Sequence, residues 1–215
     1  MQNAVPAVVG SGAVGSGVAD RAVSRSLAAR HEAYADEVRR LVEAGYSVMR
    51  RTGGVDPRVG DIVREAGLSN QAFYRHFRSK DELLLAVLDD GQRRLVGYLE
   101  HRLAGVDGAD EQVRAWIEGV MEQARNRDAA ENTRPFALGG ARLADRFPEE
   151  IHHSRELVLA PLRAAVAASG GDPRRDADAI YELVMGTMNE ALVQRVTPSD
   201  EDVAHLVEFA LKAIG

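Results

Sequence analysis

The stretch VGDIVREAGLSNQAFYRHFRSKDELLL, residues 59–85, decides how this chain folds. Its first apolar residues repeat at the three- and four-residue spacing of a short amphipathic helix: Val59, Ile62, Val63 and Ala66. Gly67 ends that helix, because glycine adopts the left-handed conformation of a tight turn without steric cost. Ser69 is a favoured N-cap residue and opens a second short helix, expected over Asn70–Phe77. Two short helices joined by a glycine turn predict a helix-turn-helix.

The chain before this stretch is expected to be a flexible tail followed by one long helix. Residues 1–26 are rich in glycine and small residues, which is typical of a flexible segment. A helix is predicted from about Leu27 to Arg51, and Gly53 follows it as a C-terminal cap. Asp56 is then expected to N-cap the next helix, with Pro57 at its first position.

The chain after this stretch also has helical periodicity. Ser79 or Asp81 is expected to open a helix that runs to about Leu103. Glycine- and proline-containing breaks separate the further predicted helices, which are Glu111–Arg127, Pro135–Ala144, Pro148–Ser169, Asp176–Val196 and Ser199–Ile214. No period-two strand pattern is present. The predicted fold is therefore all-α, with a helix-turn-helix domain at 27–80 and a larger helical domain at 81–215.

Composition and charge limit the possible functions. The chain has 215 residues, of which 45% are hydrophobic, and it contains no cysteine. Disulfides, thiolate metal sites and cysteine nucleophiles are thus excluded, and a reducing cytoplasm is the expected location. The net charge is −6, but residues 21–80 carry 12 Lys and Arg against 7 Asp and Glu. This basic N-terminal third on an acidic body indicates that only this third meets a polyanion.

The second short helix carries side chains that suit base recognition. Four polar residues are expected to project from it: Asn70, Gln71, Tyr74 and Arg75. Asn and Gln can pair bidentately with adenine, and Arg with guanine, in a major groove that admits a helix. Ala72, Phe73 and Phe77 are expected to face inward. Tyr74 could also be a partly buried core residue. Arg21, Arg25 and Arg30 belong either to a solvated tail or to an arm that reaches DNA.

The same stretch resembles the DNA-binding signature of the TetR family of bacterial transcriptional regulators. Its Ala-Gly-Leu-Ser, Tyr-x-His-Phe and Ser-Lys-x-x-Leu elements occur in order and without a gap within residues 66–83. The resemblance covers about fifty residues. It implies an N-terminal three-helix DNA-binding domain followed by a helical ligand-binding and dimerisation domain. The implied function is a repressor that a small, mainly apolar ligand releases from a palindromic operator.

The resemblance also assigns roles to individual residues. Tyr74 and His76 match residues that contact backbone phosphates, and Lys80 matches a phosphate-binding lysine at the next helix's N-terminus. Ser69, Asn70, Gln71 and Arg75 match base-facing or phosphate-facing positions. The family often has a threonine where this chain has Asp56-Pro57-Arg58, and Arg58 is a substitute phosphate contact there.

In the larger domain the resemblance concerns architecture alone. It implies a homodimer in which the last two helices form a four-helix bundle with a second copy. Apolar stripes that permit this run through Ile180, Val184, Thr187, Met188, Ala191 and Leu192, beside Gly186, and through Val203, Leu206, Val207, Ala210 and Leu211. The same stripes could instead cover the protomer's own core. A ligand pocket is expected among Tyr98, Trp116, Val120, Met121, Phe136, Phe147, Tyr181, Met185, Met188 and Asn189, although most of these suit an ordinary core equally well.

Two alternative functions follow from other patterns. Glu149/His152 and Glu150/His153 have the Glu-x-x-His spacing of di-metal helix bundles, which would suit a metal-dependent oxidase. Both pairs overlap on one helix, so their side chains point in different directions, and we expect no metal, no cofactor and no catalytic site. A DNA-binding activator or architectural factor that needs no ligand is the other alternative.

Overall fold

The computed structural model describes residues 17–54 and 56–215, and these residues form nine helices and no strand. The chain divides into two compact units, Met1–Arg39 and Arg40–Gly215. Helix α1, Val18–Thr52, begins in the first unit. It starts before the expected Leu27, because the Asp20 carboxylate accepts a hydrogen bond from the Gly17 N–H at 3.1 Å and so caps the first turn. Of the flexible tail predicted over residues 1–26, residues 18–26 instead belong to α1, and residues 1–16 lie outside the described residues.

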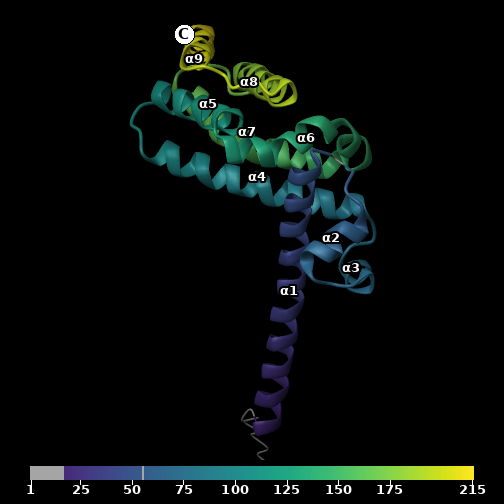
Figure 1. The fold of residues 1–215 in the computed structure, drawn as a ribbon. Helices are drawn as coiled ribbons and strands as arrows, with labels where there is room; N and C mark the ends of the chain where they lie inside the picture. The colour runs from purple at the N-terminus through teal and green to yellow at the C-terminus, as the bar shows by residue number, and fades with distance from the viewer. Residues whose placement is uncertain (1–16, 55) are drawn as a thin grey trace, which may run out of the picture. The chain divides into compact units, whose positions relative to one another are not determined.

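The second unit contains the remaining helices (Figure 1). They are α2 Val59–Ala66, α3 Asn70–His76, α4 Lys80–Ala104, α5 Ala109–Arg125, α6 Arg127–Arg146, α7 Pro148–Ala168, α8 Arg175–Gln194 and α9 Asp200–Ile214. Most bounds agree with the sequence prediction within a few residues. The exception is α6, which begins well before the expected Pro135. The Asn126 side chain accepts hydrogen bonds from the Asp128 and Ala129 N–H groups, both at 3.1 Å, and Pro135 lies buried inside the helix.

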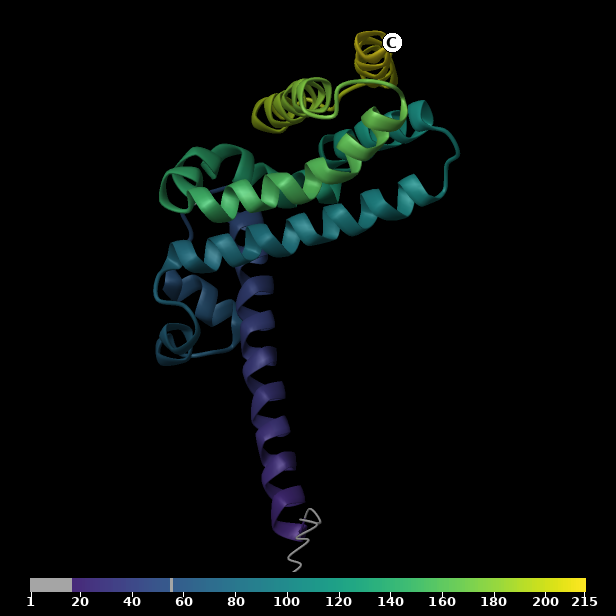
Figure 2. The same ribbon diagram turned by 180° about the vertical axis from the view of Figure 1, so that it is seen from behind.

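Helix α5 lies at the centre of the larger domain and contacts α4, α6, α7, α8 and α9. Its Trp116 is fully buried, and the indole N–H donates to the Val158 carbonyl of α7 at 3.1 Å. Figure 2 shows α4 and α7 side by side across the domain, and residue contacts join them. One hydrophobic cluster, with side chains from each helix from α4 to α9, forms the core. The burial of these apolar side chains stabilises the domain.

A second hydrophobic cluster joins α1 to the larger domain. It consists of Met49 of α1, Leu84 of α4 and Leu143 of α6, with Leu88, Phe136, Phe147 and Ile151 packed against it. Beside it, the Tyr46 hydroxyl of α1 donates to the Val87 carbonyl of α4 at 2.7 Å. Burial raises the pKa of Tyr46 to about 12, so this hydroxyl keeps its proton at neutral pH. These contacts connect the C-terminal end of α1 to α4 and α6.

Candidate nucleic-acid interface

Helices α2 and α3 contact each other and form the predicted helix-turn-helix. The turn between them centres on Gly67, whose backbone has the left-handed angles φ 63° and ψ 36°. The Gly67 N–H donates to the Arg64 carbonyl, and the Leu68 N–H donates to the Val63 carbonyl at 2.8 Å. This pattern satisfies carbonyls that a helix C-terminus otherwise leaves unpaired. The expected role of Gly67 is confirmed.

An arginine that the sequence did not single out supports this turn. Arg40 of α1 donates to the Ala66 carbonyl through Nε at 3.1 Å and through Nη2 at 2.6 Å, and also to the Gly67 carbonyl at 3.2 Å. A positive side chain at a helix C-terminus also interacts favourably with the helix dipole. Arg40 therefore fixes the end of α2 against α1. No local pattern reveals this role, since the two partners lie 26 and 27 residues further along the chain.

A second polar link holds α2 to α1. Glu65 of α2 accepts from the Ser47 hydroxyl at 2.8 Å and from the Arg51 guanidinium at 2.8 Å. The hydrogen bond from Arg51, followed by that from Ser47, holds the pKa of the Glu65 carboxyl below its usual range. No local sequence pattern indicates this link. It fixes the orientation of α2 and, through the turn, that of α3.

Helix α3 is opened by Ser69, as the sequence predicted. The Ser69 hydroxyl accepts a hydrogen bond from the Ala72 N–H at 3.1 Å, and the Ser69 backbone is extended. Ala72 and Phe73 are buried. The Phe73 and Phe77 rings lie 5.8 Å apart and face the interior, as expected. Short helices are marginal on their own, so this cap and this packing determine where α3 lies.

The opposite side of α3 faces solvent. Asn70, Gln71 and Arg75 are exposed, and Tyr74 is 60% exposed. The Tyr74 ring meets the Phe73 ring edge to face at 5.2 Å, which leaves its hydroxyl end outward. The interior placement of Tyr74 that the sequence left open is therefore wrong. One side of α3 presents amide, phenol and guanidinium groups to solvent on a firmly held backbone.

The residues assigned to phosphate lie in α3 and at the N-termini of α2, α3 and α4. Ser69 and Arg58 are exposed and His76 is half-buried. Lys80 is the first residue of α4, next to the N-cap Ser79, and its ammonium group bonds to the Asp56 carboxylate. The predicted start of α2 is wrong: its N-cap is Arg58, and Asp56 and Pro57 precede the helix. Asp56 instead forms an ion pair with Lys80. The two residues are 24 positions apart, so no local sequence pattern predicts the pair.

Comparison with known proteins agrees with this architecture. Residues 41–87 match the family model of bacterial regulatory proteins of the tetR family. The HTH-type transcriptional regulator CymR of Pseudomonas putida is 26% identical over 169 residues, which cover 76% of this chain and 81% of CymR. Residues 41–87 of this chain are a DNA-binding domain of the tetR family. TetR regulators bind operator DNA and small-molecule ligands.

Two solved structures share the fold along most of the chain. Reduced NemR of E. coli aligns with a TM-score of 0.64 at 18% identity, over 83% of this chain and 95% of NemR. FadR of Bacillus subtilis in complex with stearoyl-CoA aligns with a TM-score of 0.59 at 16% identity, over 81% of this chain and 96% of FadR. The described residues thus share the overall fold of these solved proteins. No helix among its described residues is long and apolar enough to cross a membrane.

The expected ligand-pocket residues of this TetR-type chain fall into separate groups. The central core cluster buries Trp116, Val120, Met121, Tyr181 and Met188, and Met185 packs against its margin. Phe136 and Phe147 belong to the cluster that joins α1, α4 and α6. Tyr98 is 36% exposed and its hydroxyl accepts from Arg102 at 3.2 Å, while Asn189 is half-buried on α8. The structure therefore brings six of the expected residues together and places the other four elsewhere.

The apolar stripes of the last two helices face the protomer's own core. Ile180, Val184, Met188, Leu192, Val203 and Val207 are all buried within this single chain. The alternative that these stripes cover the core is thus supported, and they do not form an outward face. Gly186 lies on the opposite side of α8, where a Cβ atom would meet nothing within 4 Å. Leu183, Val193 and Phe209 are exposed, at 37%, 44% and 57%.

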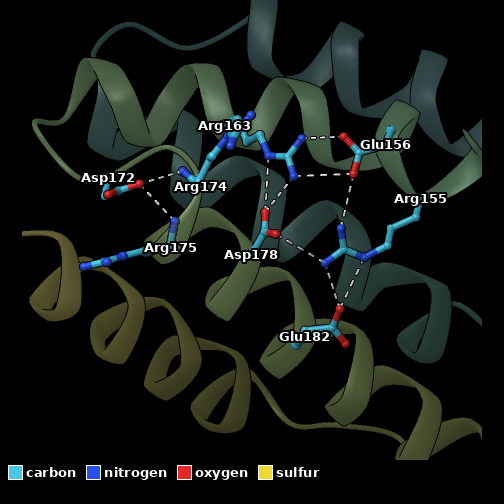
Figure 3. A network of polar contacts seen from close by, with 8 residues as sticks. All are labelled: Arg155, Glu156, Arg163, Asp172, Arg174, Arg175, Asp178 and Glu182. Atoms are coloured by element: carbon cyan, nitrogen blue, oxygen red, sulfur yellow. Dashed lines mark hydrogen bonds and ion pairs between the residues drawn. The ribbon is translucent and has the colours of Figure 1, made fainter. Parts of the chain in front are cut away.

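Ion pairs fasten α7 to α8 in this domain (Figure 3). Arg163 donates to Asp178 at 2.8 Å and also contacts Glu156, and Arg155 donates to Glu182 at 2.9 Å. The hydrogen bond from Arg163 holds the pKa of Glu156 below its usual range. These pairs are partly exposed, so each contributes modestly, but together they set the register of the two helices. Within the described residues, no group of three His, Cys, Asp or Glu side chains could hold a metal ion, and this includes Glu149, Glu150, His152 and His153.

Proposed function

We propose that this TetR-family regulator is a homodimeric, cytoplasmic repressor that binds a palindromic operator through α3. The observation that carries the proposal is the exposed polar side of α3, held by the Ser69 cap and by the buried Phe73 and Phe77 rings. A rigid helix with outward amide and guanidinium groups suits base recognition in a major groove. Asn70, Gln71 and Arg75 would read base edges in this arrangement.

The residues around α3 would fix the position of the helix on DNA. Tyr74, His76, Ser69, Arg58 and Lys80 would contact phosphates, and phosphate contacts position a protein without reading sequence. Each bidentate base contact contributes about 1–3 kcal/mol of discrimination, whereas loss of a phosphate contact weakens binding to all sequences equally. The two sets of residues therefore differ in the effect that their substitution should have.

The test is binding to a labelled duplex from upstream of the chain's own gene, compared with a scrambled duplex, at physiological salt. Gln71→Ala and Arg75→Ala should weaken binding to the first duplex and reduce the preference over the second. Arg93→Ala is the matched control, because it removes an exposed arginine from α4. Equal affinity of the parent protein for both duplexes would refute the proposal.

We infer that a second copy packs on the outward side of α8 and α9. Leu183, Gly186 and Val193 follow one another at three- and seven-residue spacing on α8, and the exposed Phe209 lies on α9. A symmetric dimer would present two α3 helices to successive major grooves, about 34–36 Å apart. Light scattering of Leu183→Glu tests this. The variant should be monomeric, and Leu157→Glu on α7, with the same 37% exposure, should stay dimeric.

A small, mainly apolar ligand in the C-terminal domain would release the operator by favouring a different separation of the two α3 helices. The large apolar cluster around Trp116, with Met185 of α8 packed against it, supports this site. FadR of Bacillus subtilis, which shares the fold, was solved with stearoyl-CoA. Stearoyl-CoA is therefore a first probe, with free coenzyme A as the control. A probe that binds this domain without lowering operator affinity contradicts the release mechanism.

A further inference from the structure

The Lys80 side chain forms an ion pair with a carboxylate at the protein surface. Its ammonium group bonds to Asp56 in the loop between α1 and α2, and its side chain is 29% exposed. The Lys80 hydrogen bond is the main cause that holds the pKa of Asp56 below its usual range, so Asp56 is charged at neutral pH. A DNA phosphate that binds Lys80 must therefore compete with this carboxylate or approach close to it.

Asp56 has a second cationic partner, which comes from the C-terminal domain. Arg142, near the end of α6, lies with one guanidinium nitrogen 3.5 Å from the same Asp56 oxygen that Lys80 contacts. The other guanidinium nitrogen of Arg142 bonds to Asp81 in the first turn of α4. Arg146, one helical turn further along α6, lies 3.1 Å from the other Asp81 oxygen. The end of α6 thus reaches both Asp56 and Asp81.

These side chains line an open cavity of about 390 Å³, which also includes Asp145. The neighbouring apolar cluster of Met49, Leu84 and Leu143 fixes the backbones of α1, α4 and α6 close to this cavity. Ion pairs at such a solvent-accessible edge exchange partners at small cost, because each pair contributes little by itself. A small displacement of the Arg142 side chain would therefore change how strongly Asp56 holds Lys80.

We propose that Asp56 is a positioning residue that competes with DNA phosphate for Lys80, and that Arg142 of α6 weakens this competition by sharing Asp56. The inference rests on the proposed function, because it takes Lys80 as a phosphate contact. When Arg142 stays close, Asp56 is partly neutralised and Lys80 is available to DNA. When α6 moves away, Asp56 is left to Lys80 alone and operator affinity falls. The C-terminal domain would then control a DNA contact directly through charge.

The experiment measures operator and scrambled-duplex affinity by fluorescence anisotropy at several salt concentrations. Asp56→Asn should bind both duplexes roughly two- to five-fold more tightly, since an exposed ion pair has about that strength. Its plot of log affinity against log salt should steepen by up to about one unit, as expected for one added phosphate contact. Asp145→Asn is the matched control, since it removes the same charge from the same cavity, and its effect should be smaller.

Two further variants separate the possible failures. Lys80→Ala should weaken binding to both duplexes. In the double variant Lys80→Ala/Asp56→Asn, the second substitution should raise duplex affinity by no more than Asp145→Asn raises it in the parent. If Lys80→Ala binds as tightly as the parent, the phosphate role in the proposed function is wrong. If Lys80→Ala weakens binding but Asp56→Asn is no tighter than Asp145→Asn, this inference is overturned and the proposed function stands. Arg142→Gln should bind more weakly than the parent, and tighter binding would remove α6 from the mechanism.

Discussion

Helices α3 and α8 differ in how well their own residues predict which side of the helix faces solvent. Helix α3 is short and has one buried side, formed by Ala72 and Phe73, and one polar exposed side. Helix α8 is long and carries apolar residues on both sides, with Val184 in the core and Leu183 in solvent. Polarity therefore identifies the outward side of α3, while on α8 periodicity alone does not show which apolar side faces the protomer's own core.

The comparison shows that contacts between neighbouring residues determine the helix ends and the turn, whereas contacts between distant residues determine the core. The cap at Ser69 and the turn at Gly67 satisfy backbone groups within a few residues, so their residue types reveal them. The core around Trp116 unites helices from α4 to α9, and its composition does not distinguish packed interior from ligand cavity. Substitutions in the two regions should accordingly differ in both size and kind of effect.

The largest effect is expected in the core. Trp116→Ala should lower the free energy of unfolding by about 3–5 kcal/mol, because it removes a fully buried indole and its hydrogen bond to Val158. Urea unfolding followed by circular dichroism measures this. Trp116→Phe, which keeps an aromatic ring, should lose less. A loss below about 1 kcal/mol for the alanine variant would indicate that Trp116 borders open space, which would make it a ligand-pocket residue after all.

The turn should show the next largest effect. Gly67→Ala should lower the free energy of unfolding by about 1–2 kcal/mol, because its φ of +63° strains any residue with a Cβ atom. The added Cβ would also lie 3.1 Å from the Arg40 guanidinium. Gly60→Ala in α2 is the matched control. A Cβ there meets nothing within 4 Å, so this variant should be more stable by about 0.5–1 kcal/mol. Equal effects in thermal unfolding would contradict the role of the turn.

The sequence predicted the helical fold, the turn and the outward side of α3, because each depends on residues close together in the chain. It misplaced the start of α2, since Asp56 and Pro57 have the residue types of a helix start but Asp56 pairs with Lys80. It also began α6 at Pro135, although Asn126 caps that helix and Pro135 is buried inside it. Arg40 and the link from Arg51 to Glu65 were missed because their partners come from another helix.

The N-cap of α3 offers a smaller and more local effect. Ser69→Ala should cost about 1 kcal/mol, because the Ala72 N–H loses its acceptor. Operator affinity should fall further than stability alone explains, since the first turn of α3 carries Asn70 and Gln71. Ser79→Ala at the α4 N-cap is the matched control, with the same lost bond, to the Glu82 N–H. If both variants reduce operator affinity equally, the α3 cap has no special part in DNA binding.

The smallest effect is expected from the polar link between α1 and α2, and it should depend on pH. Glu65 has a pKa below its usual value in the folded state, so it stabilises the protein above the ordinary glutamate pKa. That stabilisation is lost as the pH falls through the folded-state pKa. Glu65→Gln should therefore unfold at a slightly lower temperature than the parent at pH 7, and the difference should shrink in acid. Glu43→Gln, an exposed glutamate on α1, serves as the control. A difference that is constant with pH would mean that packing by the Glu65 side chain, and not its charge, fixes α2 against α1.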